Sequence, residues 1–161
     1  DKEAAMNIAF TGHRPHKLGG YDDTTNKCAD IKTSILDVLQ PLCPRNKAKF
    51  IVGMALGVDI WAAEIAIAKS VPFDAYIPFR GQESKWPEHS QARYRDILQH
   101  ADTVKYVCDD GYAAWKLQRR NEAMVNACDV LIAVWDGTSG GTANCVRYAE
   151  KKRKNIIHIQ P

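Results

Sequence analysis

The segment VLIAVWDGTSGGTANCV, residues 130–146, decides the fold of this chain. Its first five residues are all apolar and end at a turn, which predicts a short buried strand. Three glycines follow within five residues, at Gly137, Gly140 and Gly141, and a helix is expected to begin at Thr142. Glycine lets the backbone approach an anion closely, and a helix start presents unpaired N–H groups. A strand that enters a helix through such a turn often receives phosphate.

The rest of the chain repeats this order of strand and helix. The predicted strands span residues 6–10, 50–52, 73–77, 103–107, 130–134 and 155–159, and the predicted helices span 28–42, 58–69, a segment ending near 100, 115–127 and 142–152. Regular alternation predicts an α/β, Rossmann-like doubly wound fold, with a mostly parallel sheet flanked by helices. We expect a single domain over residues 6–161, and we interpret residues 1–5 as an expression-tag remnant.

The composition argues against several classes of function. The chain has 161 residues and a net charge of +3, which is too small by itself to indicate nucleic acid as a partner. The five cysteines form no C-x-x-C pair, which argues against a metal site and favours reduced thiols in the cytoplasm. No apolar run approaches the roughly 18 residues of a membrane span. We therefore expect a cytoplasmic protein without membrane, metal or cofactor.

Four polar or glycine-rich loops follow the predicted strands. They read TGHRP, GMALGVD, PFRGQESKW and WDGTSGGT. In an open parallel sheet the ligand crevice lies beyond the carboxyl ends of the strands, so these loops should converge there. None matches the Walker pattern G-x-x-x-x-G-K-[ST] or the dinucleotide pattern G-x-G-x-x-G, which argues against both of those nucleotide sites.

Two of the loops, at residues 53–59 and 140–142, are predicted to bind phosphate. The alternative for each loop is a tight turn with ordinary capping. The residues expected to contact the ligand are Gly12, His13, Arg14, Gly53, Ala55, Gly57, Asp59, Arg80, Trp86, Arg119, Asn121, Asp136, Gly137, Gly140, Gly141, Thr142 and Asn144.

Several of these side chains have a structural alternative. Arg14 could clamp a phosphate with two hydrogen bonds. Trp86 could stack on a base or pin its own loop to the body of the protein. Arg119 is the candidate ligand arginine of its helix, and Arg120 is expected to face solvent. Asp136 could accept from a ribose hydroxyl or fix the following turn.

Four blocks of the sequence, in the right order, resemble the SLOG superfamily of Rossmann-like domains. GMALGVDIWAAEIA resembles the helix start of the DprA/Smf group, and GGTANCVRYA lies where LOG phosphoribohydrolases carry P-G-G-x-G-T-x-x-E. TGHRP and RNEAMVNACDVLIAVWDG resemble the YpsA-like branch. The resemblance implies a nucleotide or an ADP-ribose-like small molecule as ligand, bound by a sensor or sequestering protein.

One departure from the LOG pattern argues against an enzyme. Cys145 occupies the position of the LOG glutamate, and cysteine is a poor substitute for the carboxylate that N-glycosidic hydrolysis requires. Asp59, Glu64 and Asp136 are the nearest acidic alternatives, so a nucleotide-processing enzyme such as a phosphoribohydrolase stays the second hypothesis. Single-stranded DNA binding is the third. The Ala- and Ile-rich helix 58–69 could pair two copies of the chain or belong to the core.

Overall fold

A computed structural model describes residues 5–43 and 47–161 of the chain. The strands are β1 (Met6–Gly12), β2 (Ala48–Val52), β3 (Phe73–Ile77), β4 (Thr103–Tyr106), β5 (Val130–Val134) and β6 (Asn155–Ile159). The helices are α1 (Asn26–Leu42), α2 (Val58–Ala68), α3 (Glu88–Leu98), α4 (Ala114–Ala127) and α5 (Gly141–Lys151), with a short 3-10 turn η1 at Pro15–Lys17.

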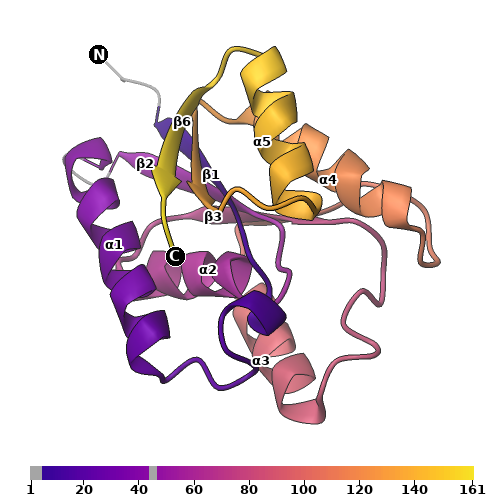
Figure 1. Cartoon of the computed structure of the whole chain (residues 1–161). Coiled ribbons are helices and arrows are strands. Elements are labelled where there is room, and N and C mark those ends of the chain that lie inside the picture. Colours follow the sequence, from indigo (N-terminus) through magenta and orange to yellow (C-terminus); the bar gives the residue numbers. More distant parts are fainter. Residues whose placement is uncertain (1–4, 44–46) are drawn as a thin grey trace.

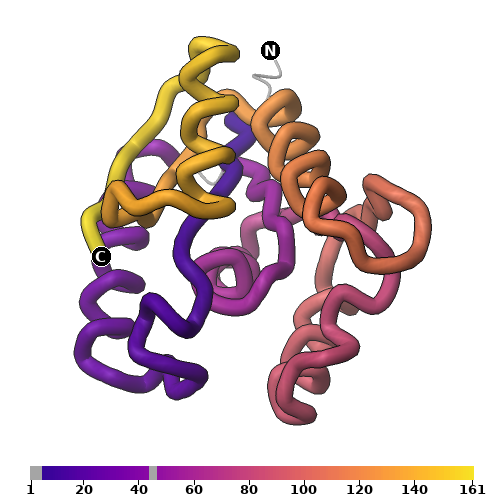
Figure 2. Tube along the Cα trace, turned by 45° about the vertical axis from the view of Figure 1, so that its right-hand side comes forward, coloured from indigo at the N-terminus to yellow at the C-terminus, as the bar shows by residue number. Residues whose placement is uncertain are grey.

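The strands form one sheet in the order β4-β3-β2-β1-β5-β6, and every neighbouring pair is parallel. The chain builds the sheet outward from β1 to β4, then returns past β1 to add β5 and β6. Helices α1, α2 and α3 cover one face, and α4 and α5 lie side by side on the other (Figures 1 and 2). The predicted Rossmann-like doubly wound fold is therefore confirmed.

Burial on both faces of the sheet explains the apolar runs in the sequence. All five residues of β5 are buried, because β5 lies between β1 and β6 and has helices on both sides. Ile132 and Val134 pack with α1 and α2, whereas Leu131 packs with Met124 and Ala149 of the opposite layer. Successive side chains of a strand point to opposite faces, so one apolar run supplies two separate cores.

The element bounds match the sequence predictions closely, although β2 and α1 each begin two residues earlier than expected. Three other differences concern individual residues. β1 continues to Gly12 because Thr11 and Gly12 pair with β5. Pro41, expected to close the first helix, lies inside α1, which ends one residue later at Leu42. α4 begins at Ala114, so Arg119 and Asn121 lie in its second turn and do not open it. Residues 1–4 of the expected tag, and Pro44, lie outside the described residues.

The strand order places a topological switch between β1 and β5. The connection from β1 leads to the face of α1, whereas the connection from β5 leads to the face of α5. The two loops separate at this point and leave room beyond the carboxyl ends of the strands, which is where open α/β sheets bind ligands. In the described part of the chain, no helix has the length and apolarity needed to cross a membrane.

Candidate ligand site at the carboxyl ends of β1 and β5

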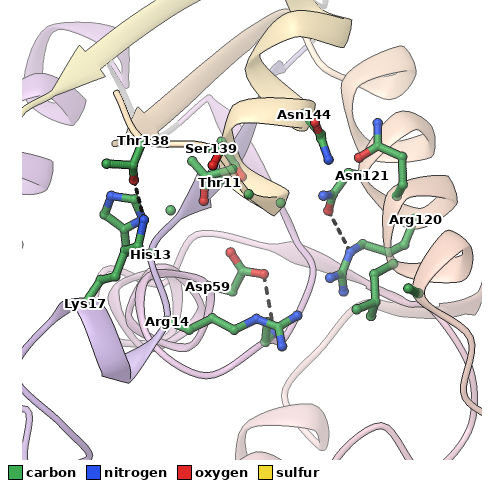
Figure 3. A pocket seen from close by; sticks show the side chains of 18 of the residues that line it. Thr11, His13, Arg14, Lys17, Asp59, Arg120, Asn121, Thr138, Ser139 and Asn144 are labelled. Atoms are coloured by element: carbon green, nitrogen blue, oxygen red, sulfur yellow. Dashed lines mark hydrogen bonds between the residues drawn. The ribbon is translucent and has the colours of Figure 1, made fainter. Parts of the chain in front are cut away.

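A cavity of about 440 Å³ lies at the switch point. Four segments that are distant in sequence converge on it, as the close-up in Figure 3 shows: the loop after β1, the start of α2, the first half of α4 and the start of α5. Its lining residues are Thr11, Gly12, His13, Arg14, His16, Lys17, Ala55, Asp59, Ala114, Leu117, Gln118, Arg120, Asn121, Thr138, Ser139, Gly140, Gly141, Thr142 and Asn144. The volume falls in the range of small-molecule sites.

The start of α5 is open to this cavity. Gly140 precedes the helix with a φ of +140°, and no side chain of the described residues caps it. A Cβ built on Gly140 or Gly141 would meet no atom within 4 Å, so packing does not require glycine there. The first turn of α5 holds no acidic residue. The unpaired N–H groups and the positive end of the helix dipole therefore face free space that suits an anion.

The second glycine bend, residues 53–57, is filled by the protein itself. The Val58 amide donates to the carbonyl oxygen of His13 at 3.5 Å, and the Ala55 amide donates to Oδ2 of Asp59 at 3.3 Å. A Cβ on Gly57 would lie 2.5 Å from the His13 carbonyl oxygen. Of the predicted phosphate loop 53–59, only Ala55 and Asp59 line the cavity. The bend thus supports the loop after β1, and only the start of α5 is left open to the cavity.

A buried pair of opposite charges forms the floor of the cavity. Asp59 is 7% exposed and Arg120 is 3% exposed. Burial raises the pKa of Asp59, while the charges of Arg120 and Arg14 and the Ala55 amide oppose that rise. Burial likewise lowers the pKa of Arg120, and the Asp59 charge opposes that shift. A Cβ on Gly53 would lie 2.8 Å from Nη1 of Arg120 and from Oδ2 of Asp59, so the present positions of both side chains require glycine there.

The prediction that the Arg120 side chain faces solvent is wrong, because this side chain is buried. Its Nη1 donates to the Gly53 carbonyl at 2.5 Å, and its Nε donates to Oδ1 of Asn121 at 2.9 Å. Arg119, the predicted ligand arginine, is exposed and does not line the cavity. Helical spacing is the sequence signal that could have indicated the burial of Arg120. Arg120 lies four residues from Lys116 and from Met124, and all three are buried on one side of α4.

Arg14 is the basic group available to a ligand. Its side chain is exposed and extends into the cavity beneath Asp59 in Figure 3. Among residues 5–43 and 47–161 its guanidinium forms no hydrogen bond or ion pair, although its charge acts on Asp59. Lys17, by contrast, donates to the Thr138 hydroxyl and so ties the loop after β1 to the loop after β5. Lys17 is thus held across the cavity mouth, whereas no hydrogen bond fixes the Arg14 guanidinium.

His13 connects the same two loops in its neutral form. The Asp136 amide donates to Nε2 of His13 at 3.1 Å, which requires an unprotonated Nε2. Burial lowers the pKa of His13, against the raising effect of the Asp136 carboxylate. Hydrogen bonds from Thr138 hold the pKa of Asp136 at about 2. Asp136 therefore fixes its own turn, one of the two roles considered from the sequence, and it does not line the cavity.

The remaining predicted residues outside the lining have other contacts. Arg80 stacks over the Tyr106 ring at 4.0 Å, and Trp86 packs edge-on against Tyr94 at 5.4 Å. Trp86 thus pins its loop, the alternative to base stacking. Gly137 has a φ of +89° and belongs to the turn that Asp136 fixes. Predicted residues that do line the cavity are Gly12, His13, Arg14, Ala55, Asp59, Asn121, Gly140, Gly141, Thr142 and Asn144.

The sequence did not single out several lining residues: Thr11, His16, Lys17, Ala114, Leu117, Gln118, Arg120, Thr138 and Ser139. Most of them adjoin predicted positions, but the residues of α4 come from a segment that follows no central strand. Gln118 is one of them, and its Oε1 is buried without a hydrogen-bond partner among the described residues. The amide Nε2 of the same side chain donates to Oε2 of Glu122 at 3.3 Å.

Cys145 is an inert core residue. It is fully buried, and burial raises the pKa of its thiol to about 12. Glu64, one of the acidic alternatives, lies away from the cavity and forms an ion pair with Arg93. Asp59 is the one carboxylate in the cavity lining. In the described part of the chain, no three His, Cys, Asp or Glu side chains group closely enough to hold a metal ion.

Comparisons with known proteins place this chain in a family. The chain is 29% identical over 153 residues to UPF0398 protein BH1768 of Halalkalibacterium halodurans, covering 91% of this chain and 81% of that protein. It is 32% identical over 138 residues to the SPbeta prophage-derived protein YoqJ of Bacillus subtilis, covering 75% of this chain and 81% of YoqJ.

Among solved structures, the fold is similar to DNA processing protein A of Helicobacter pylori, which was described for its single-stranded DNA binding mode. The TM-score is 0.71 at 22% identity, over 98% of this chain and 66% of that one. Residues 8–160 match the sequence model of the family described as the YspA SLOG family. The resemblance to SLOG proteins is thereby confirmed, and the chain belongs to the YspA SLOG family.

Proposed function

We propose that this chain binds a nucleotide-type small molecule, such as a nucleoside phosphate or an ADP-ribose derivative, in the cavity between β1 and β5. The observation that carries the proposal is the start of α5, which has no side-chain cap and no acidic residue and opens into the same cavity as the Arg14 guanidinium. Phosphate would accept from the α5 amides and from Arg14. The sugar would lie toward α4, where Gln118 and Asn121 line the cavity.

We further propose binding without turnover, as in a sensor or a sequestering protein. Hydrolysis of an N-glycosidic bond would need a carboxylate free to assist. Asp59 is engaged by Arg120 and by the Ala55 amide, and Cys145 is buried. Incubation with AMP, followed by chromatography, should yield no free adenine. Base release that disappears in Asp59→Asn would replace this proposal with the enzyme hypothesis.

Calorimetry with AMP, ADP and ADP-ribose tests binding directly. We expect a partner in the micromolar range or tighter, which corresponds to about 8 kcal/mol of binding free energy. Gly141→Trp should abolish the heat by filling the space before α5, and Arg14→Ala should weaken binding. Arg119→Ala is the matched control, because Arg119 is exposed on α4 outside the cavity. Absence of heat with every nucleotide would defeat the proposal.

Single-stranded DNA is the second candidate. Net charge argued against nucleic acid, but the cavity lining has a local excess of cations, with Arg14, Lys17 and Arg120 against the carboxylate of Asp59. The Helicobacter pylori protein of similar fold is described for single-stranded DNA binding. DNA binding predicts that affinity for an oligonucleotide exceeds affinity for a mononucleotide and falls steeply with salt. Equal affinity for the two, independent of salt, would eliminate DNA.

A further inference from the structure

The carboxylate of Asp59 uses only one of its two oxygens inside the protein. Its Oδ2 accepts a hydrogen bond from the Ala55 amide at 3.3 Å. Among residues 5–43 and 47–161 its Oδ1 has no donor, although the side chain is 7% exposed and lines the cavity. Buried carboxylate oxygens normally accept hydrogen bonds. Oδ1 of Asp59 is therefore available to a donor that enters the cavity.

Arg120 faces this carboxylate without a direct bond to it. Figure 3 shows the two side chains approaching from α2 and α4, on opposite sides of the cavity that both of them line. Their charges attract each other, but in the described part of the chain no hydrogen bond or ion pair joins them. Nη1 and Nε of Arg120 donate to Gly53 and Asn121, and its Nη2 has no acceptor within the same residues.

Asn121 adds a second unused donor to the same wall of the cavity. Its Oδ1 accepts from Nε of Arg120 at 2.9 Å, which orients the amide group. Its Nδ2 has no acceptor among the residues that the structure describes, and Asn121 lines the cavity. The floor thus presents one unused acceptor, on Asp59, together with unused donors on Arg120 and Asn121. A ligand group that both donates and accepts hydrogen bonds would satisfy this set.

We propose that Asp59, Arg120 and Asn121 form a subsite for the ribose hydroxyls, so that the cavity selects nucleotides with a free 2′,3′-diol. The inference rests on the proposed function and names the part of the ligand that decides specificity. A hydroxyl donates to the carboxylate and accepts from the guanidinium or the amide, whereas a phosphate oxygen only accepts and is repelled by Asp59.

This assignment has two consequences for the function. Asp59 would accept from Ala55 on one oxygen and from the ligand on the other, which leaves no oxygen to act as a base and agrees with binding without turnover. Internal nucleotides of single-stranded DNA carry no free sugar hydroxyl, so they could not use the subsite. A nucleobase amino group is the rival donor to Asp59, and the choice of probes has to separate it from the diol.

AMP and 2′,3′-dideoxy-AMP form the decisive pair of probes, because they share base and phosphate and differ by the two hydroxyls alone. Calorimetry on the wild-type chain should show AMP binding about tenfold more tightly, the size of one hydrogen bond to a charged group. Equal affinities would overturn this inference and leave the proposed function standing, and that is also the result expected if a base amino group contacts Asp59. Failure of both probes to bind would overturn the proposed function as well.

Variants assign the preference to the floor of the cavity. Asp59→Asn should lose most of the preference for AMP and still bind 2′,3′-dideoxy-AMP, with circular dichroism to verify that the variant is folded. Glu64→Gln is the matched control, because it neutralises another carboxylate of α2 that lies outside the cavity, and it should keep the full preference. Asn121→Ala supplies a second test if Asp59→Asn does not fold, and it should weaken AMP more than the dideoxy probe. An undiminished preference in folded Asp59→Asn or in Asn121→Ala would refute the subsite.

Discussion

The Asp136 amide donates a hydrogen bond to Nε2 of His13 across 3.1 Å, and this contact joins the ends of β5 and β1. The bond requires neutral imidazole, and His13 is only 5% exposed. The two loops that frame the cavity are therefore joined by a group that can be protonated near neutral pH. Protonation would take away the acceptor and leave the Asp136 carboxylate, 3.1 Å from Nε2, as the partner.

Stability should decrease in mild acid because of His13. Its folded-state pKa is lowered from 6.5, so the unfolded chain binds more protons than the native chain just below pH 6.5. The contribution of neutral His13 is complete above pH 6.5 and is lost as the pH falls toward the folded-state pKa. Urea unfolding at pH 7.5 and 5.5 measures the effect. His13→Gln should show a smaller pH dependence, and an identical dependence in both proteins would refute this assignment.

Replacement of glycine by alanine should destabilise the chain at Gly57 but not at Gly141. Gly57→Ala places a Cβ 2.5 Å from the His13 carbonyl oxygen at a φ of +93°, so we expect a loss of about 2–3 kcal/mol in the free energy of unfolding. Gly141→Ala meets no atom within 4 Å and should leave the melting temperature unchanged or slightly higher. Thermal unfolding of the two variants provides the comparison. Equal destabilisation would mean that both bends are packed.

The buried charge pair should matter more for stability than an exposed one. Asp59→Asn leaves the Arg120 guanidinium buried without its counter-charge, which should cost about 3 kcal/mol in the free energy of unfolding. Glu64→Gln is the control, because the Glu64 carboxylate is 39% exposed in its pair with Arg93. Its loss should cost about 1 kcal/mol or less. Chemical denaturation curves measure both, and the prediction fails if the two variants lose equal stability.

Cys145 should be unreactive in the native chain. Its thiol is buried, with a pKa raised to about 12, so almost no thiolate exists at pH 8. Cys43 and Cys108 are partly exposed, and burial raises the pKa of Cys43, so Cys108 should be alkylated first by iodoacetamide. Peptide mass spectrometry after brief labelling distinguishes the sites, and labelling in urea confirms that Cys145 can react once unfolded. Rapid native labelling of Cys145 would contradict its assignment to the core.

Local patterns in the sequence determined the secondary structure and the position of the cavity. The apolar runs at residues 73–77, 130–134 and 155–159 predicted three strands with the bounds that the structure has. The alternation of strands and helices implied a parallel sheet, and in such a sheet the loops after β1 and β5 have to end at the same edge. These inferences needed only periodicity and chain order, both of which are local properties.

The roles of individual side chains were decided by tertiary contacts. Residues 53–57 and 137–141 are both rich in glycine, yet the His13 carbonyl fills the first bend and nothing fills the start of α5. Arg119 and Arg120 are adjacent and chemically identical, and the packing of α4 against the sheet sends Arg120 inward. Composition cannot distinguish such pairs, because each outcome depends on atoms contributed by a distant part of the chain.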